Sequence, residues 1–213
     1  MSIRIVSLLV SMLLFQAYAA AGTIYDNGPK NDDSTAWNFT GQDFASDTFT
    51  VSGGSSTVSG VSIWVLIFPT DHNPTAEITI TSQANGGNVY FDQVLQFSES
   101  NCYAAGWGYN WCEETAAWEN GPVLPNGTYW VNLKNGSLPS GGPVFWNQNS
   151  GVGCNSPGCP SQAENSFGTI PSEAFAILGT PDGSKSSTPK TTSLLMFGAG
   201  FLGVVGIIRK KID

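Results

Sequence analysis

The sequence predicts an all-β protein, an antiparallel β-sandwich of the jelly-roll type. Short runs with β-type alternation are separated by Gly, Asn, Ser and Pro, and no helical period lies between them. About eight strands at this spacing favour two packed sheets over a helical or α/β fold.

The expected strands follow one another through residues 22–180. Residues 61–68 form a continuous apolar run, which predicts a central strand covered on both faces. Turn residues separate the runs at 52–55, 85–88, 125–127 and 135–136. The strands themselves are expected at residues 47–51, 57–68, 76–81, 88–97, 127–133, 143–146 and 173–178.

The N-terminus carries a targeting signal. Residues 1–21 contain one positive charge at Arg4, then an apolar stretch, then small residues from Ala17 to Ala21. This order is typical of a secretory signal peptide that is removed on export. Residues 22–180 would then form a single ectodomain.

The C-terminus predicts a membrane anchor. Residues 194–208 contain no charged and no strongly polar side chain, and a helix of that length spans about 22 Å. Arg209, Lys210 and Lys211 follow and would hold the tail, residues 209–213, on the cytoplasmic side. Residues 181–193, rich in Ser, Thr and Pro, predict a flexible linker to this anchor.

The predicted ectodomain is acidic. Between residues 22 and 180, fourteen Asp and Glu stand against two Lys, which leaves a net charge of −12. This balance argues against a nucleic-acid partner, because phosphate binding needs clustered Lys and Arg. It suits a cation-rich or sugar-rich exterior.

Four cysteines form two local pairs, Cys102 with Cys112 and Cys154 with Cys159. In an exported chain this even number predicts a disulfide within each pair. Zinc binding is the alternative. Zinc sites usually space both cysteine pairs by two to four residues, whereas nine residues intervene in the first pair.

Aromatic residues cluster around the first cysteine pair. Trp107, Tyr109 and Trp111 lie inside it, and Trp118 follows shortly afterwards. We expect a loop here, and rings on a loop held by a disulfide could stack on sugars, because they offer broad apolar faces at low entropy cost. Alternatively, they fill one end of the sandwich. Extracellular polysaccharide is therefore a candidate partner.

Residues that could carry out catalysis are scarce. His72 is the only histidine, and it lies among turn formers, where we expect it to be exposed. Glu113, Glu114 and Glu119 could supply the paired carboxylates of a glycosidase, which flank the sugar bond at about 5–10 Å. Acidic residues in so acidic a chain are usually solvated surface. We therefore expect no enzymatic activity, with a secreted hydrolase as the third alternative.

No cofactor is expected. A calcium site is a weaker alternative, because hard cations prefer clustered carboxylate and amide oxygens, although the spacing here matches no loop motif. The candidate calcium ligands are Asp26, Asn27, Asp32, Asp33 and Asp47.

The last 25 or so residues resemble the PEP-CTERM sorting signal, which joins a Pro-Glu-Pro motif, a Gly-containing membrane helix and an Arg/Lys cluster. The resemblance implies recognition and cleavage by a membrane-embedded exosortase-type enzyme. Pro189 matches the motif, whereas Lys190 and Thr191 replace its Glu and second Pro. With this degenerate motif we predict slow or absent cleavage, and retention as a single-pass anchor.

Turn and core signatures also resemble the β-sandwich ectodomains that carry this tail. The resemblance implies a fold and a location outside the cytoplasm, and no common activity or catalytic residue. We therefore expect an envelope-anchored or extracellular-matrix-associated protein with a structural or interaction role; the alternative is a carbohydrate-binding module. The resembling segments are 24–29, 45–51, 58–64, 125–130 and 178–181.

Overall fold

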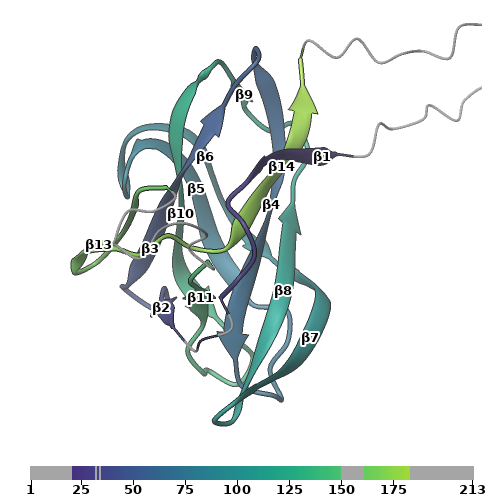
Figure 1. Ribbon diagram of the computed structural model, residues 1–213, viewed down its shortest axis with the longest axis vertical. Helices are drawn as coiled ribbons and strands as arrows, with labels where there is room; N and C mark the ends of the chain where they lie inside the picture. Colours follow the sequence, from purple (N-terminus) through teal and green to yellow (C-terminus); the bar gives the residue numbers. More distant parts are fainter. Residues whose placement is uncertain (1–20, 32, 34, 150–160, 183–213) are drawn as a thin grey trace, which may run out of the picture. The chain divides into compact units, whose positions relative to one another are not determined.

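The computed structural model describes residues 21–31, 33, 35–149 and 161–182. These residues fold into two antiparallel β-sheets and the turns that connect their strands (Figure 1). Every pair of named strands in these sheets is antiparallel. The described residues form no helix, so none there could cross a membrane. The predicted antiparallel all-β class is confirmed, while the jelly-roll connectivity stays a prediction.

The eight-stranded sheet is organised around one long strand, β4 (Ser56–Ile67). Its neighbours on one side are β14 and then β11, and on the other side β9 and β8. The remaining members of this sheet are β1 (Gly22–Asp26), β2 (Ala36–Asn38), β7 (Ser98–Gly106), β8 (Tyr109–Ala117), β9 (Val123–Leu124), β11 (Phe145–Asn147) and β14 (Phe175–Pro181).

The six-stranded sheet has the order β13-β12-β3-β10-β5-β6. In Figure 1 its strands β3, β10 and β13 lie to the left of β4 and β8. Its members are β3 (Phe44–Val51), β5 (Thr75–Gln83), β6 (Gly86–Gln96), β10 (Gly127–Ser137), β12 (Ala163–Asn165) and β13 (Gly168–Ile170).

The hydrophobic core joins the two sheets in a sandwich-like arrangement. Val61 and Ile63 of β4 belong to the same fully buried cluster as Ile78 of β5 and Leu133 of β10. Each such side chain contributes about 1.5–3 kcal/mol when it leaves water. The alternating residues of these strands therefore hold the sheets together and leave the other faces for polar contacts.

The aromatic segment around the first cysteine pair is a β-hairpin and not a loop. β7 pairs with β8, and Gly106 lies opposite Tyr109. Trp107 and Gly108 form the two-residue turn, with φ angles of 48° and 83°. Positive φ at both positions is what a type I′ hairpin turn requires. Sequence alternation is weak in β7 because Ser, Asn, Ala and Gly dominate it, so the pattern did not indicate a strand.

One predicted turn lies inside a strand. Asn135 and Gly136 belong to β10, where the pairing with β5 shifts between Lys134 and Ser137. Asn135 has a φ of 54°, so the Asn-Gly sequence that suggested a turn serves a β-bulge instead.

Several predictions lie outside the described residues and stay predictions. They concern the signal peptide, the linker, the membrane helix and the following features: Asp32, Cys154, Cys159, Pro189, Lys190, Arg209, Lys210 and Lys211.

Candidate functional site

A groove of about 490 Å³ opens on the face of the eight-stranded sheet that points away from the core. β4 contributes Ser62 and Trp64, which alternate with the buried Ile63 and Val65. The apolar run is therefore covered by the core on one face only, which corrects the prediction of two covered faces. We call this hollow the outer groove; it is lined by Thr23, Asp26, Gly28, Pro29, Ser62, Trp64, Glu113, Thr115, Phe175, Ala176 and Leu178.

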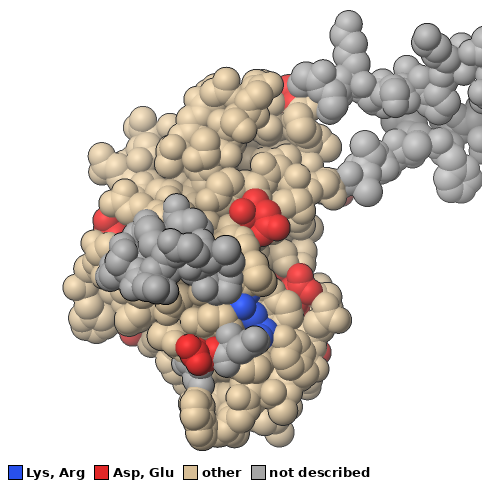
Figure 2. Space-filling view, in the orientation of Figure 1, with Lys and Arg blue, Asp and Glu red and all other residues tan. Residues whose placement is uncertain are grey.

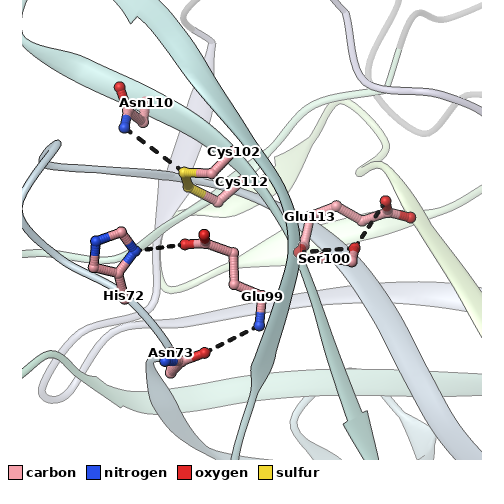
Figure 3. Close-up of a disulfide and its surroundings, with 8 residues drawn as sticks. All are labelled: His72, Asn73, Glu99, Ser100, Cys102, Asn110, Cys112 and Glu113. Atoms are coloured by element: carbon pink, nitrogen blue, oxygen red, sulfur yellow. Dashed lines mark hydrogen bonds and ion pairs between the residues drawn. A yellow bond between two sulfur atoms is a disulfide. The ribbon is translucent and has the colours of Figure 1, made fainter.

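Glu113 is a firmly held polar group of the outer groove. Its Oε2 accepts hydrogen bonds from Nδ2 of Asn101 at 2.7 Å and from Oγ of Ser100 at 3.0 Å; Figure 3 shows the serine contact. Its Oε1 accepts a longer one, 3.5 Å, from Oγ of Ser62. Oε1 therefore keeps hydrogen-bonding capacity for a donor that enters the groove.

The second carboxylate of the outer groove is turned toward its own backbone. Asp26 Oδ1 accepts the backbone N–H of Gly28 at 2.9 Å. Figure 2 shows that, on the face drawn there, acidic groups lie apart from one another on a largely uncharged surface. The lining of the groove itself mixes polar and apolar side chains.

An aromatic surface continues from the outer groove. The ring centroids of Trp64 and Tyr103 lie 5.9 Å apart, and those of Tyr103 and Trp111 lie 5.8 Å apart. Nζ of Lys30 lies over all three rings, 3.8 Å from the centroid of Trp111, 5.2 Å from that of Tyr103 and 5.6 Å from that of Trp64. These cation–π contacts hold Lys30, in the connection between β1 and β2, against the eight-stranded sheet, and they cover the ring of Trp111.

The four predicted sugar-stacking residues do not form one surface. Trp107, at the hairpin tip, is 83% exposed. Tyr109 stacks on Phe68 with centroids 4.8 Å apart, and Trp111 lies under the lysine. Trp118 is buried against Phe91, with centroids 4.2 Å apart, so it is a core residue and its prediction is wrong.

The three glutamates that could have formed a glycosidase pair point in different directions. Glu113 lines the outer groove, Glu114 is fully buried on the opposite side of β8, and Glu119 is exposed beyond its end. Adjacent residues of a strand face opposite sides of the sheet. These carboxylates therefore do not flank a common substrate bond.

His72 is exposed, as predicted, and it also contacts Glu99. Its Nδ1 lies 2.7 Å from Oε2 of Glu99 (Figure 3), and this hydrogen bond, followed by the carboxylate charge, raises the pKa of His72. The backbone N–H of Glu99 donates to Oδ1 of Asn73 at 3.0 Å, which fixes the loop to the strand.

The predicted disulfide between Cys102 and Cys112 is confirmed. The two residues lie directly opposite each other in β7 and β8, with Cα atoms 4.2 Å apart. Figure 3 shows the sulfur atoms next to the His72–Glu99 pair. The carboxylate of Glu99 and both sulfur atoms lie within 4.8 Å of one another. We call these four side chains, His72, Glu99, Cys102 and Cys112, the hairpin cluster.

Glu114 adds an unsatisfied carboxyl group near this cluster. It lies directly opposite Glu99 in the ladder, it is fully buried, and neither carboxyl oxygen accepts a hydrogen bond of normal geometry. Burial, followed by the charge of Glu99, raises the pKa of Glu114 to about 7, against the N–H of Asn73 and the charge of His72, which lower it.

A second buried polar cluster surrounds Asp47 on β3. Its two carboxyl oxygens accept five hydrogen bonds, so no lone pair is left for a metal ion. The donors are the backbone N–H groups of Thr48 (2.7 Å) and Glu173 (2.6 Å), Nδ2 of Asn27 (3.2 Å), and the hydroxyls of Ser172 (2.9 Å) and Ser161.

The described members of the predicted calcium-ligand set are therefore not gathered in one place. Among the described members, only Asn27 and Asp47 come together, and they bond to each other. Asp26 lines the outer groove, and Asp33 is exposed. Sequence proximity suggested the set, but the side chains of its described members lie in different surroundings.

Glu173 is the unbonded neighbour of Asp47. It is fully buried, and neither of its carboxyl oxygens has a hydrogen-bond partner. Burial raises its pKa well above the ordinary value, and the charge of Asp47 adds to this. Burial also raises the pKa of Asp47 to about 7, against the donors that lower it. Every donor points at Asp47 and none at Glu173, so the charged form of Asp47 is the better stabilised of the two.

Trp64 was not among the predicted site residues. A signal was present, since Ser62 and Trp64 occupy alternate positions in an otherwise apolar run. A polar residue two positions away on the same face marks an open side of the strand. Glu173 and Glu99, by contrast, carried no local signal.

No protein-family model, curated protein or solved structure matches this chain.

Proposed function

We propose that this chain is an exported, envelope-anchored or matrix-associated β-sandwich protein with a binding role, and that the outer groove binds an extracellular polysaccharide. The observation that carries this proposal is the pairing of Trp64 with Glu113 in one groove on a rigid sheet. An apolar ring and a fixed acceptor side by side are the two elements that sugar recognition needs.

The chemistry of the groove supports a sugar ligand. A pyranose presents C–H groups on its faces and hydroxyls around its rim. Trp64 offers a ring for the face, while Oε1 of Glu113 and the hydroxyls of Ser62 and Thr115 offer partners for the rim. The volume of about 490 Å³ lies within the range of small-molecule sites, so it would take a short stretch of a chain.

Binding without cleavage is the form we propose. Glycoside hydrolysis needs two carboxyl groups placed on either side of the bond. In the outer groove Asp26 is occupied by the N–H of Gly28, and Glu113 is occupied at Oε2 by Asn101 and Ser100. Both carboxylates therefore serve as hydrogen-bond acceptors in this proposal.

The location rests on the ends of the chain. Residues 1–21 would direct export, and residues 194–208 with the following basic residues would keep the chain in the membrane. The Cys102–Cys112 disulfide suits an oxidising exterior. Because Lys190 puts a positive charge where the sorting motif has Glu, an exosortase-type enzyme would cleave slowly. Intact-mass measurement tests this: a C-terminus at Asp213 supports retention, and one near Pro189 contradicts it.

A glycan array with the full-length chain tests the binding proposal, followed by calorimetry on each hit. Saturable binding is expected, with an affinity at least about tenfold lower in Trp64→Ala, equal to about 1.4 kcal/mol. Glu113→Gln should weaken binding as well, because the amide presents a donor in place of one acceptor.

Trp107→Ala is the matched control, because it removes an exposed tryptophan of the same domain outside the groove. Loss of binding in this variant alone would place the sugar at the hairpin tip and contradict the groove proposal. Absence of any glycan ligand would favour a purely structural role, and release of shortened sugars would favour the hydrolase.

A further inference from the structure

The hairpin cluster brings together four side chains of the types that bind zinc. Glu99, Cys102 and Cys112 each place one oxygen or sulfur within 4.8 Å of the others. Nδ1 of His72 lies 2.7 Å from Oε2 of Glu99. Four donors of sulfur, nitrogen and oxygen type match the tetrahedral coordination that zinc prefers.

The protein around the hairpin cluster already holds the donors in place. β7 and β8 fix the two cysteines opposite each other, and Asn73 fixes the backbone of Glu99. Nδ2 of Asn110 lies 3.7 Å from Sγ of Cys102, as Figure 3 shows, where it could donate to a thiolate. Such outer contacts orient metal ligands and strengthen their binding.

A second observation is an unpaired carboxyl group at the same place. Glu114 is fully buried directly opposite Glu99, and its carboxyl oxygens have no partner. Like charges directly opposite each other in a ladder destabilise it. A cation between the strands would offset this conflict, and His72, with its side chain 53% exposed, leaves a path for the cation from solvent.

We propose that His72, Glu99, Cys102 and Cys112 form a zinc-binding site when the Cys102–Cys112 disulfide is reduced. The disulfide and the zinc site are then two states of one cluster. The oxidised state staples β7 to β8 through sulfur, and the reduced state does so through the metal. The proposal is independent of the outer groove, since Glu113 lies on the other face of β8.

A dithiol can serve as the reductant of the Cys102–Cys112 disulfide. The dithiol supplies two electrons and two protons, becomes a disulfide itself, and leaves two thiols at Cys102 and Cys112. Zinc then binds both sulfur atoms as thiolates and releases two protons. Nδ1 of His72 gives up its hydrogen bond to Glu99, and the metal takes the place between nitrogen and oxygen.

The test uses the full-length chain with Cys154→Ser and Cys159→Ser, because the second cysteine pair could bind zinc by itself. The chain is reduced without oxygen, freed of reductant and titrated with Co²⁺ as a spectroscopic probe, then with Zn²⁺. One Co²⁺ per chain is expected, with thiolate-to-cobalt charge-transfer absorption that Zn²⁺ abolishes. The oxidised chain should show no such absorption.

Variants of His72 and Glu99 distinguish a four-ligand zinc site from zinc binding by the two cysteines alone. His72→Ala and Glu99→Ala should each lower the zinc affinity of the reduced chain by at least about tenfold. Glu119→Gln is the matched control, because it removes an exposed carboxylate outside the hairpin cluster and should leave the affinity unchanged.

Reduction removes the covalent link between β7 and β8, so circular dichroism accompanies each titration. If reduction lowers the β-sheet signal, zinc should restore it in the parent chain and fail to do so in His72→Ala. Zinc binding that is equal in the oxidised chain, or unaffected by both ligand variants, would overturn the proposal. So would the absence of zinc binding after reduction.

Discussion

The two sheets differ in how they use the polar groups on the faces away from the core. On the six-stranded sheet, Asn132 of β10 is fully buried and satisfied: its Oδ1 accepts from Ser46 and from the N–H of Asn85, both at 2.7 Å. Its Nδ2 donates to the hydroxyls of Thr79 at 2.9 Å and Thr81 at 2.8 Å. These groups bind one another and leave nothing for a ligand.

The eight-stranded sheet leaves its polar groups facing a hollow. Ser62, Glu113 and Thr115 line the outer groove beside Trp64, and the contact between Ser62 and Glu113 is long, at 3.5 Å. Satisfied polar groups stabilise a sheet, whereas groups with spare capacity can bind a ligand. The two outer faces therefore differ in whether their polar groups already have hydrogen-bond partners, more than in residue type.

Removing Asn132 from the hydrogen-bonded outer face of the six-stranded sheet should give the largest loss of stability. Asn132→Ala leaves the buried Ser46, Thr79 and Thr81 hydroxyls without their shared partner, so the free energy of unfolding should fall by about 2–4 kcal/mol. Urea denaturation measures the loss. Ser62→Ala on the other sheet is the control and should change stability by about 0.5 kcal/mol or less. Equal losses in both variants would contradict the distinction between the faces.

Two substitutions of different size at Trp64 should show whether its ring binds sugar in the outer groove. Trp64→Phe keeps an aromatic face, so we expect sugar affinity to fall less than the roughly tenfold loss in Trp64→Ala. Calorimetry with the array-selected glycan gives both values. If Phe and Ala lower the affinity equally, stacking is not what Trp64 supplies.

The buried pair Asp47–Glu173 should make stability depend on pH. Both pKa values are raised by burial, so the folded chain binds these protons more tightly than the unfolded chain. The resulting stability is present below the unfolded pKa of about 4 and is lost as the pH rises through the folded value, about 7 for Asp47. Nearby titratable groups are Tyr25, whose pKa is raised to about 12, and Asp26.

Glu173→Gln tests this sign, because the amide keeps the shape of the protonated acid and cannot ionise. The fall in the free energy of unfolding between pH 5 and pH 8 should be smaller in the variant, and the variant should gain most at pH 8. Denaturant titrations across this range measure it. Parallel curves for the two proteins would show that Glu173 does not carry the proton.

The smallest effect is expected at the hairpin tip. Trp107 has a φ of 48° and precedes Gly108, and Asn-Gly is the sequence that a type I′ turn prefers. Trp107→Asn should therefore raise stability by about 0.5–1 kcal/mol and leave sugar binding unchanged. Thermal unfolding and the glycan titration measure the two parts, and a loss of binding would move the site to the tip.

The sequence predicted strands best where one face is buried. β4, β5 and β10 show alternation of apolar and polar residues, and each was expected within a few residues of its observed bounds. The sequence predicts a loop where β7 and β8 lie, because β7 lacks large apolar residues. The register of β7 depends on its pairing with β8. The short strands β2, β12 and β13 have too few residues to show a period.

The all-β class, the acidic balance and the pairing of Cys102 with Cys112 could be predicted from the sequence, because alternation, charge and close cysteine spacing are local properties. Which polar residues meet depends instead on how the strands pair in three dimensions. Trp64 and Glu113 are 49 positions apart and share the outer groove, and Glu173 donates to Asp47 from 126 positions away. Such contacts follow from which strands pair and which faces turn outward, and a one-residue change of register would exchange every such side chain for its neighbour.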